Sequence, residues 1–266
     1  MRADKYFAEK FGSRTKAAEA IEKGFVLVNG KPVKSKDEIK ETDEIAFIQP
    51  KETFVSNGGY KLARALEAFG FDCRDKTFVD IGASTGGFTD CLLQNGAKKV
   101  FAVDVGESLL HESLSTDKRV VIMDNTNARY LSKASFLEEI DGVVTDVSFI
   151  SLRHIFPTIK SVLGETGEAL VLIKPQFECE NQNIGKSGIV RPTAHAKIVE
   201  KVLGYAKENG LYPFDITHAP IKKGKNIEYI LRLSPRYTGA KTVEHIIKQV
   251  KDFVSKDENN TNGRKR

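Results

Sequence analysis

Apolar runs and amphipathic stretches alternate along the chain after residue 60. The apolar runs, rich in Val, Ile and Phe, predict buried strands at Phe78–Ile81, Val100–Val103, Val120–Met123, Gly142–Thr145, Ala169–Ile173, Phe214–His218 and Ile227–Leu233. The stretches between them predict helices at Phe88–Gln94, Ser132–Glu139, Leu152–Val162 and Ala194–Asn209. This alternation predicts an α/β fold with a mostly parallel seven-stranded sheet covered by helices on both faces. Because no helix separates the last two strands, one of them should be antiparallel.

The first fifty residues follow a different pattern. Two short helices are predicted, one with Tyr6, Phe7 and Phe11 on one side and one that follows Ser13 as its N-cap and ends at Gly24. A strand over 25–28 then meets Asn29-Gly30, the strongest short hairpin signal, and further strands begin near Val33 and at Ile45. The chain is therefore predicted to have a small α+β domain over 1–50, a linker over 51–59, a large domain over 60–255 and a disordered tail over 256–266.

Composition narrows the class of protein. The 266 residues are 40% hydrophobic and 29% charged, an ordinary globular balance. No apolar run reaches the roughly 18 residues that a membrane helix needs, and the N-terminus lacks the apolar core of a signal peptide. Three scattered cysteines have neither disulfide nor zinc spacing, and the histidines show no ligand spacing, so no metal is expected. The prediction is a cytoplasmic protein without stable membrane association.

Positive charge is concentrated at the N-terminus. Residues 1–36 carry nine basic and four acidic side chains, so this segment alone accounts for the net charge of +5 of the whole chain. A small basic domain is suited to binding the phosphate backbone of a folded RNA. The alternative is a solvent-exposed helix face that binds no partner, which would carry the same charge.

The loop Asp80–Phe88 follows the first strand of the predicted sheet and opens a helix. Its small residues allow a ligand to approach the backbone, and Asp104 ends the next strand, where an acid accepts hydrogen bonds from ribose hydroxyls. Asp124-Asn125, after the third strand, fits either an adenine contact or a helix cap. The glycine spacing departs from the G-x-G-x-x-G fingerprint and thus favours S-adenosylmethionine over a nicotinamide cofactor. The predicted cofactor-binding residues are Asp80, Gly82, Ala83, Ser84, Gly86, Gly87, Phe88, Asp104, Asp124 and Asn125.

Four charged residues lie at strand ends or at the start of a helix, where open α/β sheets build active sites. They are Lys61, Asp146, Lys174 and Glu228. S-adenosylmethionine, the cofactor favoured by the glycine-rich loop, is a methyl donor. Methylating a ribose hydroxyl with it requires a base or an oriented lone pair, alignment of the hydroxyl with the methyl group, and exclusion of water. A lysine held by carboxylates suits this task.

Several motifs resemble known families. Ser13–Ala17, Ile21, Gly24 and Val28–Lys31 resemble the S4-type RNA-binding domain, and the four charged residues resemble the Lys-Asp-Lys-Glu tetrad of FtsJ-like ribose 2′-O-methyltransferases. The stretches GGYKL, DIGASTGGFTD, DVSFISL, LIKPQFE and GIVRP resemble the TlyA family, also called hemolysin A. The resemblance implies an S4-type domain joined to a Rossmann-like class I methyltransferase domain, with S-adenosylmethionine as cofactor and cytidine in ribosomal RNA or ribosomal subunits as substrate.

The same resemblance assigns roles. Lys174 would be the catalytic base toward the 2′-hydroxyl, Asp146 and Glu228 would orient it, and Lys61 would place the nucleotide. Whether Lys174 removes the proton or only orients the hydroxyl stays open. The expected RNA contacts are Arg2, Arg14, Lys16, Lys31, Lys186 and Arg191.

Two departures from the family pattern concern RNA contacts. Ser56-Asn57 stands where the family has Ser-Arg, and Arg2-Ala3-Asp4 where it has Arg-Leu-Asp. The segment Gln176–Pro192 is predicted to be a mobile lid, and the turn Lys222–Lys225 to add phosphate contacts.

Two other function classes stay open from sequence. One is a hemolysin or other membrane-active protein, and the other a non-catalytic RNA-binding module that kept the fold. The modified nucleotide, the state of the RNA substrate and the oligomeric state are not determined by the sequence.

Overall fold

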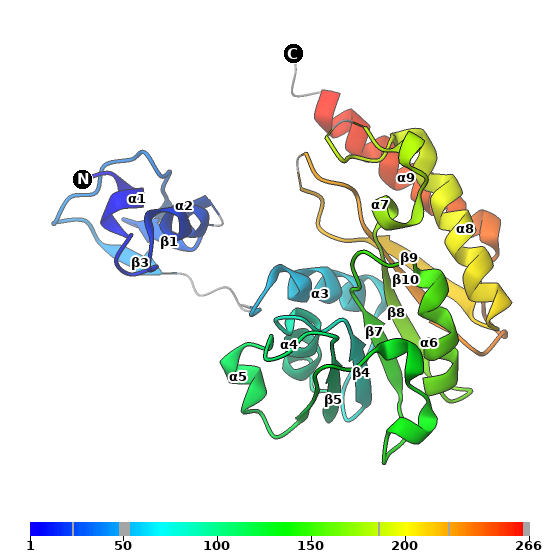
Figure 1. Cartoon of the computed structure of the whole chain (residues 1–266). Helices are drawn as coiled ribbons and strands as arrows, with labels where there is room; N and C mark the ends of the chain where they lie inside the picture. The colour runs from blue at the N-terminus through cyan, green and yellow to red at the C-terminus, as the bar shows by residue number, and fades with distance from the viewer. Residues whose placement is uncertain (23, 48–53, 186, 223, 263–266) are drawn as a thin grey trace. The chain divides into compact units, whose positions relative to one another are not determined.

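The computed structural model describes residues 1–22, 24–47, 54–185, 187–222 and 224–262. The chain divides into two compact units, Met1–Thr53 and Phe54–Arg266 (Figure 1).

The N-terminal unit is a small α+β domain. Its elements are α1 (Ala3–Tyr6), α2 (Arg14–Glu22), β1 (Val26–Val28), β2 (Lys31–Pro32) and β3 (Ile45–Phe47). The three strands form an antiparallel sheet in the order β2-β1-β3. At the β1–β2 hairpin, Asn29 and Gly30 have φ of 52° and 75°, the left-handed pair that a two-residue turn requires. Ala17 and Ile21 of α2 pack into a small core with Phe7 and Val26.

The second unit is built on a seven-stranded sheet. Its strands are β4 (Thr77–Ile81), β5 (Lys99–Val103), β6 (Val120–Met123), β7 (Gly142–Thr145), β8 (Glu168–Ile173), β9 (Tyr212–His218) and β10 (Tyr229–Ser234). They lie in the order β6-β5-β4-β7-β8-β10-β9. β10 is antiparallel to both of its neighbours, and the pairs from β6 to β8 are parallel. The predicted mostly parallel sheet is confirmed, and β10 is its antiparallel strand.

Helices cover both faces of this sheet. Those of the unit are α3 (Asn57–Phe69), α4 (Gly87–Gln94), α5 (Glu112–Ser115), α6 (Phe156–Val162), α7 (Pro175–Glu178), α8 (His195–Glu208) and α9 (Val243–Asn262). Apolar side chains of α3 and α4 form one core with the sheet, and those of α6, α8 and α9 form the other. Single 3-10 turns are η1 (Ala128–Tyr130), η2 (Lys133–Ser135), η3 (Leu152–His154), η4 (Asn181–Asn183) and η5 (Pro192–Ala194).

Three sequence predictions differ from the structure. The helix predicted over 132–139 is only the turn η2, because the chain then extends and buries Phe136 against the ring of Phe101. The predicted linker 51–59 is too long, because Phe54 is buried and Ser56 caps α3 by accepting a hydrogen bond from the Gly58 amide. The tail predicted to be disordered from residue 256 is helical to Asn262, since no Gly or Pro interrupts α9 before residue 263.

Candidate active site

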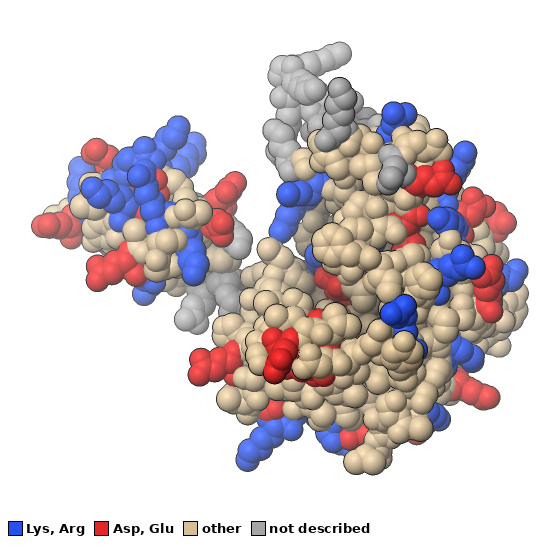
Figure 2. Space-filling view, in the orientation of Figure 1, with Lys and Arg blue, Asp and Glu red and all other residues tan. Residues whose placement is uncertain are grey.

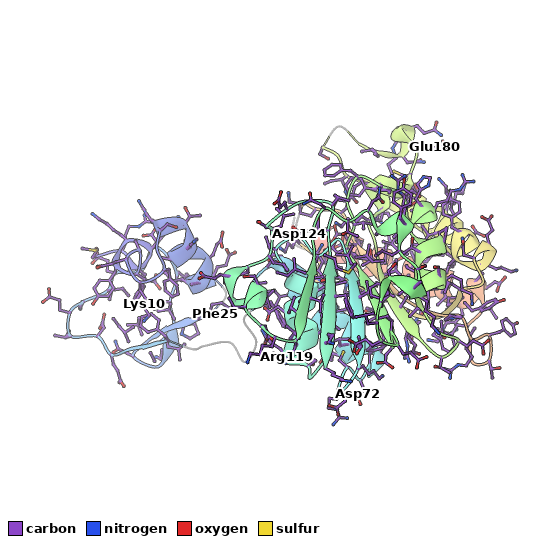
Figure 3. The ribbon with its side chains drawn as sticks, turned by 60° about the horizontal axis from the view of Figure 1, so that its bottom comes forward. Lys10, Phe25, Asp72, Arg119, Asp124 and Glu180 are labelled. Carbon is purple, nitrogen blue, oxygen red and sulfur yellow. The ribbon has the colours of Figure 1, made fainter. Side chains whose placement is uncertain are left out.

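The four charged residues lie together at the carboxyl edge of the parallel strands. Lys61 comes from the second turn of α3, and Asp146 and Lys174 directly follow β7 and β8. Glu228 directly precedes β10, and because Tyr229 pairs with Ile173 in the antiparallel register, the start of β10 lies beside the end of β8. In Figure 3 the labelled Asp124, which directly follows β6, lies at this carboxyl edge of the sheet. Asp72 and Arg119 are labelled at the opposite edge.

A chain of ion pairs joins the four side chains. Lys61 Nζ lies 2.8 Å from Glu228 Oε2 and 3.3 Å from Asp146 Oδ2. Lys174 Nζ lies 2.5 Å from Asp146 Oδ1, an ion-pair contact that lacks hydrogen-bond geometry. All four side chains are between 11% and 21% exposed, so their charges interact in a partly desolvated site while a ligand can still reach them.

The two lysines differ in their surroundings. Burial alone lowers the pKa of Lys61, but the charges of Asp146 and Glu228 outweigh it, and the net pKa is raised. Lys61 is therefore a fixed ammonium group near neutral pH. Lys174 Nζ instead donates a 2.6 Å hydrogen bond to Ser148 Oγ, and no described contact joins it to Glu228. The sequence analysis did not single out Ser148, whose hydroxyl accepts this hydrogen bond from Lys174.

Two adjoining pockets open beside these residues. One, of about 170 Å³, is lined by Gly82–Thr85 and Gly87, by Asp146 and by Ser148 and Lys174. The other, of about 400 Å³, has an apolar wall that includes Val103 and Ile150, and Asp104 lies at its side. Both contain Gly82, Ser84, Asp146 and Ser148 in their linings, so the two pockets adjoin and together make up the cavity beside the four charged residues.

Hydrogen bonds hold the glycine-rich loop, residues 82–87, against the end of β5. The Gly82 amide donates to the Val103 carbonyl (2.9 Å), and the Ser84 amide donates to Asp104 Oδ2 (2.8 Å). At φ of 82°, Gly82 adopts a backbone conformation that other residues resist. At Gly87 a Cβ would stand 2.2 Å from Ser56 Oγ, so this glycine permits the close approach of α4 to the start of α3.

Asp80 lies under this loop and is completely buried. Thr89 donates to Asp80 Oδ2 through its amide (3.0 Å) and its hydroxyl (2.7 Å), while Asp80 Oδ1 has no hydrogen-bond partner among the described residues. Burial, together with the charges of Asp146 and Asp104, raises the pKa of Asp80 to about 7. Asp80 therefore anchors α4 beneath the loop and is not part of either pocket lining.

The predicted cofactor residues thus fall into two groups. Those that line the cavity are Gly82, Ala83, Ser84, Gly87, Phe88 and Asp104. Those that do not are Asp80, Gly86, Asp124 and Asn125. Asp124 instead accepts a hydrogen bond from the Ser108 amide (2.8 Å), while the next residues, Thr126 and Asn127, do line the larger pocket. The adenine contact predicted for Asp124-Asn125 stays a prediction, and Thr126 and Asn127 are further polar residues at the same strand end.

The sequence analysis also did not single out Phe149, an aromatic residue that directly follows Ser148 of the cavity lining. Phe149 has φ of 62°, is 92% exposed and packs against the ring of Phe177 at 5.0 Å between centroids. A phenylalanine in the left-handed conformation is strained, and a ring this exposed gains little from burial, so Phe149, next to Ser148 in the chain, is a candidate functional position. Its sequence context in DVSFISL was the only available signal.

The N-terminal unit presents many cations, as Figure 2 shows on its visible face. Arg2 and Arg14 both bond the buried carboxylate of Asp4, with Nη2–Oδ2 distances of 2.9 and 3.0 Å, yet their side chains stay 46% and 59% exposed. Lys16 and Lys31 are exposed. The two arginines thus stabilise the unit while presenting part of each guanidinium to solvent.

The segment Gln176–Pro192, predicted as a lid, contains most of α7, the turn η4 and an antiparallel bridge between Ile184 and Val190. Gly185 N donates to the Ile189 carbonyl (2.8 Å), and Asn226 Oδ1 accepts from Val190 N (2.7 Å). Arg191 is exposed there. Lys186 and Lys223, two of the expected phosphate contacts, lie outside the described residues.

Within the described ranges, no helix combines the length and apolarity needed to cross a membrane. No cluster of three or more His, Cys, Asp or Glu side chains suited to a metal ion occurs among the residues that the structure describes.

Comparison with known proteins identifies both units. Residues 54–234 match the model of the FtsJ-like methyltransferase family, and residues 1–45 match the S4 domain. The chain is 44% identical to Hemolysin A of Brachyspira hyodysenteriae, over 86% of this chain and 98% of that protein. It is 37% identical to the 16S/23S rRNA (cytidine-2′-O)-methyltransferase TlyA of Mycobacterium tuberculosis, over 88% of this chain and 90% of that protein.

Solved structures agree with this assignment. A protein from Streptococcus thermophilus that carries the hemolysin name superposes with a TM-score of 0.70 at 36% identity, covering 97% of this chain and 98% of that one. An S-adenosylmethionine-dependent methyltransferase from Mesorhizobium loti shares the fold at 13% identity, with a TM-score of 0.51 over 67% of this chain and all of that one (100%). The chain therefore belongs to the TlyA family, in which an S4 domain is joined to an FtsJ-like methyltransferase domain.

Proposed function

We propose that this protein is an S-adenosylmethionine-dependent ribose 2′-O-methyltransferase that acts on cytidine in ribosomal RNA. The observation that supports this most is the chain of ion pairs through Lys61, Asp146, Lys174 and Glu228 beside the glycine-rich cavity. The named activities of the mycobacterial relative and of the Campylobacter jejuni TlyA, a 23S rRNA (cytidine-2′-O)-methyltransferase, agree with it.

The cavity suits the cofactor. Its larger part offers an apolar wall for an adenine ring and the Asp104 carboxylate for ribose hydroxyls, and its smaller part offers backbone groups of 82–85 for an amino-acid end. When bound, S-adenosylmethionine supplies an electrophilic methyl group on a sulfonium sulfur. Asp104, Gly82 and Ser84 are the residues that we expect to hold it.

The two lysines have separate tasks. Lys61, whose pKa is raised by two carboxylates, keeps its proton and holds Asp146 and Glu228 in place. Lys174, at the junction of the cavity with Asp146 and Ser148, is the group that meets the 2′-hydroxyl. The Lys174–Asp146 pair is placed to orient the 2′-hydroxyl and to take up its proton when the methyl group leaves the sulfonium sulfur for the ribose oxygen.

RNA binding is divided between the units. The basic face of the S4 domain, with Lys16 and Lys31, contacts phosphates and thereby supplies most of the affinity. Phe149, exposed at the rim of the methyltransferase cavity, offers a flat face on which an unstacked base can lie.

The test is transfer of labelled methyl groups to ribosomal RNA and to ribosomal subunits taken from cells that lack this protein. We expect the wild type to label one of these substrates at a ribose oxygen of cytidine, and Lys174→Ala to abolish labelling. Lys160→Ala, which removes an exposed lysine on α6, is the matched control and should keep full activity. Absence of labelling on every ribosomal substrate would refute the proposal, and lysis of red cells by both wild type and Lys174→Ala would favour a membrane-active protein.

A further inference from the structure

Glu178 is a buried carboxylate close to the active site that the methyl-transfer proposal does not use. It ends α7, four residues after Lys174, and only 4% of it is exposed. Its side chain crosses to the loop that follows β7: Glu178 Oε1 accepts from the Leu152 amide, and Glu178 Oε2 accepts from Ser151 Oγ, both at 2.7 Å.

These two bonds link the segments that carry two of the four charged residues. The loop after β7 runs from Asp146 through Ser148 and Phe149 to Ser151, and the segment after β8 runs from Lys174 to Glu178. Both segments leave the sheet at neighbouring parallel strands. Beyond the strands, hydrogen bonds of the sheet no longer fix their separation, so side-chain contacts must do so.

Two further contacts hold the same junction. The rings of Phe149 and Phe177 pack at 5.0 Å between centroids, and Lys201 Nζ of α8 donates to the Glu178 carbonyl (3.1 Å). The Ser151 hydroxyl also accepts from the Arg153 amide (3.2 Å), so the carboxylate binds the start of the turn η3. Glu178 therefore lies at the centre of this packing, with both of its oxygens bonded to the opposite segment.

A buried carboxylate is costly unless hydrogen bonds satisfy it. Burial raises the pKa of Glu178, while the bonds from Leu152 and Ser151 act in the opposite direction. A hydrophobic residue would fill the same space, but it would not fix the direction of the Leu152 amide or the Ser151 hydroxyl.

We propose that Glu178 is a positioning residue for methyl transfer: by bonding Ser151 and Leu152, it sets the separation of Lys174 from Asp146 and Ser148. This inference rests on the proposed function. A displacement of about 1 Å between reacting groups can lower turnover about 100-fold. Loss of the two bonds should therefore lower kcat strongly. The KM for RNA should change little, because the S4 domain is unaltered and the Phe149 ring keeps its contact with Phe177.

The experiment compares four variants of the full chain. Glu178→Ala removes both bonds, and Ser151→Ala removes one of them. Glu178→Gln can keep both, because its amide oxygen accepts from Leu152 N and its amide nitrogen donates to Ser151 Oγ. Glu168→Ala is the matched control, since Glu168 is a mostly buried carboxylate at the far end of β8 that is bonded to Arg232 instead.

We expect kcat, corrected for the folded fraction, to fall about 100-fold in Glu178→Ala and about fivefold in Ser151→Ala, with the KM for RNA within threefold of wild type. Glu178→Gln and Glu168→Ala should stay within about threefold in kcat. Amide hydrogen exchange at Leu152 should become at least tenfold faster in Glu178→Ala and stay unchanged in Glu168→Ala. Rescue by glutamine distinguishes positioning from a general loss of stability.

A folded Glu178→Ala with kcat within threefold of wild type would overturn the inference, as would a folded Glu178→Gln as impaired as the alanine variant. If Glu178→Ala does not fold, Ser151→Ala decides: a lower kcat supports positioning, and an unchanged kcat refutes it. If the wild type itself methylates no ribosomal RNA, the proposed function fails separately. Hydrogen exchange at Leu152 then decides whether Glu178 holds the two segments, because unchanged exchange in a folded Glu178 variant would contradict it.

Discussion

The buried carboxyl group of Asp80 makes the stability of this protein depend on pH in an unusual direction. Its pKa rises from an ordinary value of 3.8 to about 7 in the folded chain, chiefly because it is completely buried. The folded state therefore holds a proton on Asp80 between about pH 4 and pH 7, where the unfolded state has lost it. Stability contributed by this group is present at acidic pH, falls as pH rises through this window and levels off above about pH 7.

The size of the effect follows from the same values. A pKa difference of one between the folded and unfolded states corresponds to about 1.4 kcal/mol in the free energy of unfolding. The complete pH-dependent change therefore amounts to about 4 kcal/mol, of which about 3 kcal/mol falls between pH 5 and pH 8. Asp80→Asn removes the titration and keeps an oxygen that can accept from both groups of Thr89. The new amide N–H₂ group lacks an acceptor and costs about 1–3 kcal/mol, but this cost does not vary with pH.

The measurement is urea unfolding of wild type and Asp80→Asn, followed by circular dichroism at several pH values from 5 to 8. The difference in unfolding free energy between them should shift by about 3 kcal/mol in favour of the variant as pH rises across this range. Asp72→Asn is the matched control: hydrogen bonds from Arg74 lower the pKa of Asp72 to about 2, so this exposed group does not titrate in the window. A difference that stays constant with pH, or moves in the opposite direction, would show that Asp80 is ionised throughout and would refute the reasoning.

Three further variants test the site and its packing. Lys61→Met leaves two carboxylates without their shared ammonium group and should lower kcat at least 100-fold in the methyl-transfer assay, whereas an unchanged kcat would exclude an organising role. Phe149→Ala should raise the KM for RNA about tenfold, because base stacking is worth about 1–3 kcal/mol. Its free energy of unfolding should change by less than about 0.5 kcal/mol, since the side chain is 92% exposed; equal KM values would remove Phe149 from the RNA site. Gly87→Ala should lower the free energy of unfolding by about 1–3 kcal/mol in urea, because the new Cβ would stand 2.2 Å from Ser56 Oγ. An unchanged free energy of unfolding would mean that α3 and α4 can move apart without cost.

Local features of the fold could be predicted from the sequence. Asn29-Gly30 specified the β1–β2 hairpin, and every strand of the large sheet was located by its apolar run. These features depend on residues within a few positions of one another, where backbone preference and burial period act directly. The same local patterns failed at residues 132–139, where tertiary burial of Phe136 outweighed a helical spacing.

The site was only partly predictable. Lys61, Asp146, Lys174 and Glu228 could be named from their places at element ends and from their motifs, and Asp104 from its place after β5. Glu228 reaches Lys61 because of the reversal of β10 and its register with β8. Lys174 reaches Ser148 because β7 and β8 are neighbouring parallel strands. Sequence position alone does not fix such a register.

The amino-acid sequence by itself determined the order of the elements, the two-unit organisation and the types of residue that reach the carboxyl edge. The tertiary structure alone decided that Asp80 is buried beneath the loop, that Arg2 and Arg14 share Asp4, and that Glu178 joins the segments after β7 and β8. The physical reason is that hydrogen bonding and desolvation act between groups that are close in space, and strand order sets which distant residues become neighbours.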